Sequence, residues 1–346
     1  MAAAPTQTAT LSDQPIAGGL YYWAASSTDP NAPYGIYRHD VGTPGTPPER
    51  FYTTIETTDT GSYPNGRCVA CHALSRDGTK MSISYDGGGG ASTVMDVATR
   101  SPLPSPGHWD FAAYTAMGDY LVTESQGVLT LRDSATATIV STLPLAGACS
   151  HPDFSAMGDS MTYVQYDSGS RWGFTGGAIY TIPYDGSTQT FGTPQLIVDN
   201  TSGNNYYPSF SPDGQWIIFN RDAAGGSSYN NHAAEVWVVP AAGGTPIQLI
   251  AADVTTGLTD SWARWAPFQQ TVGGEAMYWV TFSSTRDFGT RITGGSDHPQ
   301  LWMSPFFPDR AIASMDPSGP AFRLPFQNIA SDNHIAQWAD QVIPIQ

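Results

Sequence analysis

Short apolar runs separated by turn residues are the main pattern along this chain. Four of them follow the same eight-residue frame, which ends in glycine and leads into a second apolar run. The frames occupy residues 71–78, 111–118, 151–158 and 207–214. Their closing glycines are 40, 40 and 56 residues apart, and glycine tolerates the positive φ that tight turns between strands often need. Each frame therefore predicts a strand, a turn and a second strand.

Further apolar runs extend each frame to four strands. Third strands are expected at 93–97, 128–131, 178–182 and 235–239, and fourth strands at 138–143, 194–198 and 247–250. Four short strands in roughly 40–55 residues are typical of a propeller blade.

A looser fifth unit and a divided sixth unit complete the pattern. The fifth has runs at 261–265, 277–282, 300–303 and 322–326; the sixth takes 20–24, 35–38 and 51–55 from the N-terminus and an innermost strand from 334–338 onward. Joining both termini in one blade would close the ring without a long free edge. We therefore expect a flexible leader at 1–17 and one all-β domain at 18–346. That domain would be a six-bladed β-propeller with four-stranded antiparallel blades.

Composition supports this fold class and excludes some partners. Gly 36 and Pro 27 are high, and charged residues make up only 13% of the chain. The net charge is −16 and Lys80 is the single lysine, so nucleic-acid binding is not expected. No apolar stretch approaches the ~20 residues of a membrane span. The scarcity of lysine and cysteine suggests a secreted or periplasmic protein.

Residues 68–72, Cys-Val-Ala-Cys-His, have the spacing of a c-type haem attachment site. Cys68 and Cys71 would bond the haem vinyl groups, and His72 would ligate the iron. The second axial ligand would come from His151, His334, His108 or Met81.

The Ser-Pro-Asp-Gly turn at 211–214 and its variants in the other frames resemble the TolB-like family of β-propellers. The resemblance covers nearly the whole chain and implies the fold, but that fold hosts enzymes and binding modules alike. The motif at 68–72, running directly into a frame, is also similar to exported bacterial propellers labelled haem-binding by this motif.

In a propeller, residues just before each such turn face the central channel and its mouth. Four of the seven histidines occupy such positions: His72, His108, His151 and His334. We expect them at one mouth, although a polar mouth is also the ordinary state of a propeller.

Three chemistries remain open for this mouth. The first is haem c, with a redox or ligand-binding role. The second is a metal-dependent hydrolase or lyase, in which these four histidines act on a small-molecule substrate. Its candidate metal ligands for zinc or calcium are His72, His151, His334, Cys149, Asp260, Asn205 and Asn333.

The third is a non-catalytic binding scaffold, in which Cys149 bridges to Cys68 or Cys71. Arg264, Arg286 and Arg291 could bind a carboxylate or phosphate, but we expect them to pair with surface acids. The oligomeric state stays open.

Overall fold

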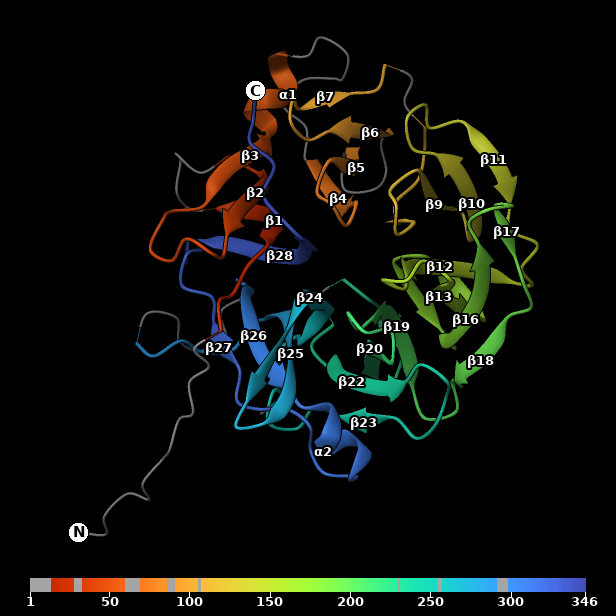
Figure 1. The fold of residues 1–346 in the computed structure, drawn as a ribbon, viewed down its shortest axis with the longest axis vertical. Helices are drawn as coiled ribbons and strands as arrows, with labels where there is room; N and C mark the ends of the chain where they lie inside the picture. Colours follow the sequence, from red (N-terminus) through yellow and green to blue (C-terminus); the bar gives the residue numbers. More distant parts are fainter. Residues whose placement is uncertain are drawn as a thin grey trace.

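The computed structural model describes residues 14–27, 33–59, 69–85, 91–104, 107–229, 231–253, 257–290 and 298–346 (Figure 1). These residues form an all-β fold of antiparallel sheets, with two short helices, α1 (Thr54–Asp59) and α2 (Pro308–Ile312). Neither helix is long and apolar enough to cross a membrane. Figure 1 shows the sheets arranged around a common centre.

The first sheet joins the two ends of the chain. Its strand order is β28-β1-β2-β3. The strands are β1 (Gly19–Ser27), β2 (Gly35–Asp40), β3 (Glu49–Thr53) and β28 (Ser331–Ala339). Leu20 lies opposite Trp338 and Trp23 opposite His334, so the C-terminal strand completes a sheet begun at the N-terminus.

Three sheets follow in chain order. One contains β4 (Val69–Leu74), β5 (Lys80–Tyr85), β6 (Ser92–Asp96) and β7 (Ser101–Pro102). The next contains β8 (Ala112–Tyr114), β9 (Tyr120–Ser125), β10 (Val128–Asp133) and β11 (Ile139–Thr142). The third contains β12 (Ala148–Phe154), β13 (Ser160–Tyr166), β16 (Ala178–Asp185), β17 (Thr190–Phe191) and β18 (Gln195–Val198).

Two more sheets return toward the C-terminus. One contains β19 (Asn204–Phe210), β20 (Trp216–Asp222), β22 (Glu235–Pro240) and β23 (Ile247–Gln248). The other contains β24 (Ser261–Val272), β25 (Glu275–Ser284), β26 (Gln300–Phe306) and β27 (Phe322–Arg323). A separate three-stranded sheet pairs β14 (Ser168–Ser170) and β15 (Gly173–Thr175) with β21 (Gly226–Ser227).

The core lies between neighbouring sheets. One apolar cluster joins Val122 and Leu131 of one sheet to Met161 and Ile182 of the next. Another joins Val236 to Val280 in the same way. β-branched and aromatic side chains pack well on such pleated surfaces, and their burial is the main favourable contribution to folding.

The predicted strands lie in the expected segments, and the all-β expectation is confirmed. Two features differ. The expected strand at 51–55 ends at Thr53, whose backbone N–H donates to Glu56 Oε2 (2.8 Å), and helix α1 begins at the next residue. The sheet of β14, β15 and β21 lies outside the repeat and had no counterpart in the prediction.

The expected leader is only partly described. Residues 1–13 lie outside the described residues, so their flexibility stays a prediction. The backbone carbonyl of Gln14 accepts a hydrogen bond from Gln270 Nε2 (2.9 Å), which ties the start of the described chain to β24.

Ala336→Asp tests how far stability depends on the C-terminal strand. Ala336 is fully buried in β28 against Leu20 and Leu301. An unpaired carboxylate there costs several kcal/mol, which is comparable with the whole stability of a typical domain, about 5–15 kcal/mol. We expect the cooperative thermal transition to be lost or to fall by more than ten degrees. The matched control, Ala135→Asp in an exposed turn, should leave the melting temperature nearly unchanged; equal effects would contradict the prediction.

Candidate functional site

A repeated bulge shapes the strands nearest the centre. In five sheets the innermost strand has one extra residue at the same place in the frame, so that two of its residues lie opposite one residue of the neighbouring strand. The first residue in each bulge has a positive φ: Cys71 (37°), His151 (51°), Tyr207 (52°), Trp262 (59°) and Ile335 (53°). Bulges re-aim side chains, and here they aim one residue per sheet at the same point.

These five residues and Phe111, which precedes β8, form an axial layer. Ring centroids are 4.3 Å apart for Phe111 and His151, 4.2 Å for His151 and Tyr207, and 4.0 Å for Tyr207 and Trp262. All the rings are buried, and Cys71 and Ile335 belong to the same apolar cluster or line the same cavity. The layer therefore fills the centre of the molecule at this depth.

The three-stranded sheet covers one side of the axial layer. Trp172, in the β14–β15 turn, lies 4.6 Å from the Phe111 ring, and Phe174 of β15 lies 5.6 Å from His151. Arg171 of the same turn forms ion pairs with the buried Asp110 and Glu124. Burial raises the pKa of Glu124 to about 7. This sheet is a cap held by aromatic packing and a buried ion cluster.

Two of the predicted histidines meet beside the axial layer. His72, His151, Cys71 and Asp110 line a cavity of about 20 Å³, which is room for about one water molecule. His72 is 3% exposed and His151 2%. Burial lowers the pKa of His72 to about 4 and that of His151 well below its ordinary value. Both rings are therefore neutral at pH 7.

The other two histidines lie elsewhere. His334 is buried among aromatic rings, 5.2 Å from Tyr229 and 6.0 Å from Trp23. Burial lowers its pKa to about 3. His108 is exposed and does not line the cavity. The structure thus brings two of the four histidines to one cavity, and this cavity is internal.

The remaining candidate ligands are engaged in separate sheets. Cys149 packs in the core beside Tyr163 with a free thiol, and burial raises its pKa to about 12. Asp260 accepts from Arg286 Nη2 at 2.7 Å. Asn205 bonds the Gly177 carbonyl and Arg221, and Asn333 bonds the Asn328 and Ser331 carbonyls. Within the described part of the chain, no three His, Cys, Asp or Glu side chains are placed to hold a metal ion.

Haem does not fit the described part of its predicted site. Both ring nitrogens of His72 are buried, and the cavity beside it and Cys71 holds about one water molecule. A porphyrin cannot enter that space, so His72 cannot ligate its iron as placed. Cys68 lies outside the described residues. Covalent attachment through Cys68 and Cys71 stays a prediction of the motif.

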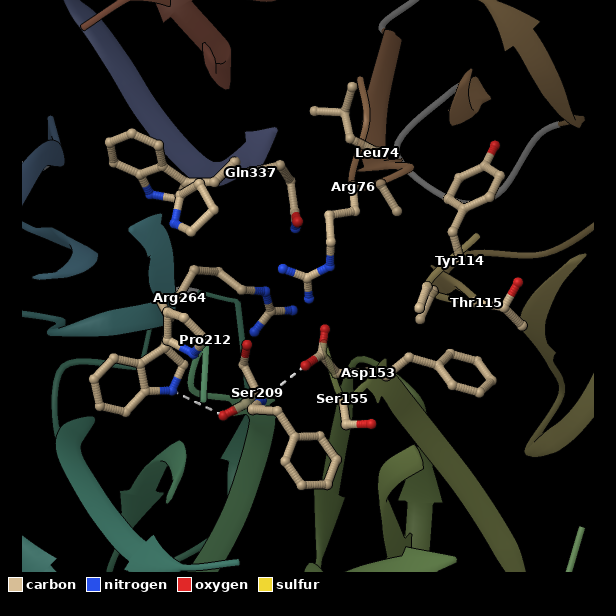
Figure 2. Close-up of a pocket in the computed structure, with 18 of the residues that line it drawn as sticks. Leu74, Arg76, Tyr114, Thr115, Asp153, Ser155, Ser209, Pro212, Arg264 and Gln337 are labelled. Carbon is tan, nitrogen blue, oxygen red and sulfur yellow. Dashed lines mark hydrogen bonds between the residues drawn. The ribbon is translucent and has the colours of Figure 1, made fainter. Parts of the chain in front are cut away.

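On the side of the axial layer away from the cap lies a larger, polar pocket of about 110 Å³ (Figure 2). We call it the central pocket. Asp153, Arg264 and Gln337 extend into it from three inner strands and Arg76 from the turn after β4, and all four residues are partly exposed. Arg264 and Gln337 also line the small cavity, so the two spaces adjoin.

Opposite charges meet in the central pocket. Figure 2 shows the guanidinium groups of Arg76 and Arg264 pointing toward the same space, next to the Asp153 carboxylate. Asp153 also accepts a hydrogen bond from the Phe210 backbone N–H (2.8 Å). Burial nevertheless raises the pKa of Asp153, although Arg264 and Arg76 favour its charged form. Asp340 also lines the pocket, and burial raises its pKa while Arg76 acts in the opposite direction. Two guanidinium groups thus face two carboxyl groups whose charged forms burial disfavours.

Most of these pocket residues were not among the predicted site residues. Asp153, Arg264 and Gln337 each lie two positions after an axial-layer residue, and side chains alternate along a strand. A residue two positions after an axial-layer residue lies on the same side of the strand, so the sequence alone could have pointed to these three residues as pocket residues. Arg264 had been expected to pair with surface acids, and this expectation was wrong. Arg286 does pair with an acid, but both are buried, and Arg291 lies outside the described residues.

Comparisons with known proteins support the fold. No protein-family model and no curated protein sequence matches the chain. The crystal structure of TolB from Acinetobacter baumannii is similar, with a TM-score of 0.57 and 15% identity over 93% of this chain and 66% of that one. A chain of the nidogen/laminin complex gives 0.51 and 10% identity over 94% of this chain and 100% of its own. A hydrazine synthase chain from Kuenenia stuttgartiensis gives 0.47 and 15% identity over 75% of this chain and 67% of its own.

The likenesses to TolB and to the nidogen/laminin chain, together with the sheets around one centre, define the class of protein: the chain has a β-propeller fold. More particularly, its fold is TolB-like, as the turns of the repeat indicated. The chain spans 66% of the length of the A. baumannii protein.

Asp260, an expected metal ligand, instead lies beside the carboxyl group of Asp253. The substitution Asp253→Asn tests this carboxyl pair. Burial and Asp260 raise the pKa of Asp253 from 3.8 to about 8. The folded state therefore holds a proton that the unfolded state releases above pH 4. As pH rises from about 4 to 8, the contribution of Asp253 to the free energy of unfolding falls. Asparagine keeps the hydrogen bond without the charge. We expect the variant's melting temperature to exceed that of the wild type by a margin that grows up to pH 8. A difference in melting temperature that stays constant between pH 4 and pH 8 for Asp253→Asn would refute the assignment.

Proposed function

We propose that this protein is a ligand-binding β-propeller whose central pocket binds a small anionic molecule. In this proposal, the six sheets of four or five strands are six blades, and the pairing of β28 with β1 closes the ring. The observation that carries the function is the convergence of Arg76 and Arg264 in one pocket. A secreted or periplasmic location stays a prediction of the sequence.

The charge pattern favours an anion over a cation. The chain has a net charge of −16 and only 14 lysine and arginine residues, yet two arginines share this pocket. The acids of the pocket are Asp153 and Asp340, and burial raises the pKa of both carboxyl groups, which disfavours their charged forms. Guanidinium groups bind carboxylates and phosphates through paired hydrogen bonds. A carboxylate or phosphate group is therefore the expected ligand chemistry.

The size and access of the pocket limit the ligand. A cavity of about 110 Å³ holds a few water molecules, and so a carboxylate or phosphate with a short carbon chain. The axial layer and the cap block the opposite side, so the ligand would enter past Arg76 and its neighbours. Gln337 offers both a donor and an acceptor for a second polar group of the ligand.

Arg264→Gln and Arg76→Gln test the anion site. Titration calorimetry with succinate, citrate and inorganic phosphate should show saturable binding that weakens with added salt. Each variant should lose at least tenfold in affinity, because a charge-assisted hydrogen bond contributes about 1.5–3 kcal/mol. The control Arg50→Gln removes an exposed arginine that pairs with Glu56, and it should bind like the wild type. Absence of binding by all three anions would overturn the proposal.

An absorption spectrum tests the rival haem function. The buried nitrogens of His72 and the cavity of about 20 Å³ leave no room for a porphyrin. This packing predicts a colourless protein, whereas the attachment that the motif predicts at Cys68 and Cys71 would colour a protein produced with haem-attachment machinery. A Soret band that survives acid–acetone extraction would establish covalent haem and would show that residues around Cys71 rearrange.

A further inference from the structure

A second pocket, which we call the lateral pocket, has a lining separate from that of the central pocket. This lateral pocket has a volume of about 460 Å³. Its walls come from Ile16 near the start of the described chain, residues 39–47 at the end of β2 and in the loop after it, Met303 of β26, and residues 322–326 at β27. Small-molecule sites typically have volumes of about 300–1,000 Å³. The lateral pocket is large enough for one ring system.

Hydrogen bonds hold these walls in place. The Val41 N–H donates to the Gly18 carbonyl (3.2 Å) and the Leu324 N–H to the Leu301 carbonyl (3.1 Å). Gln327 fixes the segment at 322–326, because its Nε2 donates to the Leu301 carbonyl (2.7 Å) and the Leu324 carbonyl (2.9 Å). A preformed pocket loses little conformational entropy when a ligand binds.

The lining is largely apolar and rigid. Ile16, Val41, Met303 and Leu324 supply aliphatic surface. Pro44, Pro47 and Pro325 add rings whose backbone φ is fixed. Proline rings and flat aromatic groups pack well against each other, as in the recognition of proline-rich segments by aromatic grooves. This lining favours a flat ring over a flexible chain.

One polar side chain lies in this apolar wall. His39 is 6% exposed and stacks on Phe326, with ring centroids 4.0 Å apart. Its Nδ1 is buried and has no hydrogen-bond partner among the described residues. Burial lowers the pKa of His39, while Asp40 acts in the opposite direction. The neutral ring has one donor and one acceptor nitrogen. Because Nδ1 is buried, Nε2 is the nitrogen that the pocket offers to a ligand.

We propose that the lateral pocket is a binding site for a small aromatic molecule with one hydroxyl or N–H group, of which phenol and indole are the simplest probes. The apolar walls bind the ring, and His39 selects the polar substituent. This site is separate from the central pocket, since the two share no lining residue.

Methyl resonances provide a direct test in the full chain. The chain has nine methionines; Met303 lines the lateral pocket, whereas Met117 and Met157 are exposed at turns of the repeat. With methionine methyl groups labelled, phenol or indole should shift the Met303 signal saturably and leave Met117 and Met157 unmoved. Equal, non-saturating shifts at all three would mean non-specific contact and would overturn the proposal.

Two substitutions separate the apolar and polar contributions. Ile16→Trp fills the pocket from its rim and should weaken both probes at least tenfold, while Val140→Trp on exposed β11 should not. His39→Phe keeps the stacking ring but removes its nitrogens. It should weaken phenol about three- to tenfold, as expected for one hydrogen bond, and leave toluene unchanged. Unaltered phenol binding in both Ile16→Trp and His39→Phe would refute the site.

Arg264→Gln distinguishes this site from the anion site. It should leave the Met303 shifts unchanged, because Arg264 does not line the lateral pocket. If indole binding failed while succinate binding persisted, only the lateral site would be overturned; the reverse result would overturn only the anion site.

Discussion

The left-handed residue in each inner-strand bulge is the constraint on which the centre of this molecule depends. A non-glycine residue at positive φ costs about 1–3 kcal/mol, and five inner strands contain one at the same place. The compensation is packing, because the bulges bring side chains from five sheets into one buried layer, which Phe111 completes from the sixth. Tyr207 shows the coupling: its ring stacks on Trp262 at 4.0 Å and lies 4.2 Å from His151. The strained backbone and the axial layer stabilise one another.

The same constraint decides what the histidines can do. His151 occupies a bulge and belongs to the layer, and His72 follows the bulge residue Cys71. Both rings are neutral and buried, so they resemble core aromatics with polar edges more than ligands at an open mouth. The partly exposed residues Asp153, Arg264 and Gln337 lie two positions further along their strands. The axial layer thus separates a side closed by the cap from a side with an accessible pocket.

The sequence was informative about the fold because the fold is repetitive. The glycines at 78, 118, 158 and 214 fix the turn of each frame, and the strands follow from the apolar runs around them. The cap was not predictable in this way, because Ser168–Ser170, Gly226–Ser227 and their partner strand are too short and too polar to stand out. The site was harder still. Counting positions before each glycine correctly placed His72 and His151 near the centre, but it could not show that two-residue bulges would aim the layer inward.

Charge explains why the accessible side is the better candidate for function. Burying an arginine requires a partner that offsets its lost hydration, and structural arginines here have one. Arg286 has Asp260 at 2.7 Å, and Arg38 has Glu49 at 2.7 Å. Arg264 instead donates to two backbone carbonyls, those of Tyr207 and Ala263, and shares the electrostatic influence of Asp153 with Arg76. Arg264 therefore contacts both the axial layer, through the Tyr207 carbonyl, and the central pocket. An anion that binds at Arg264 would therefore rest directly on the layer that the strained bulges build.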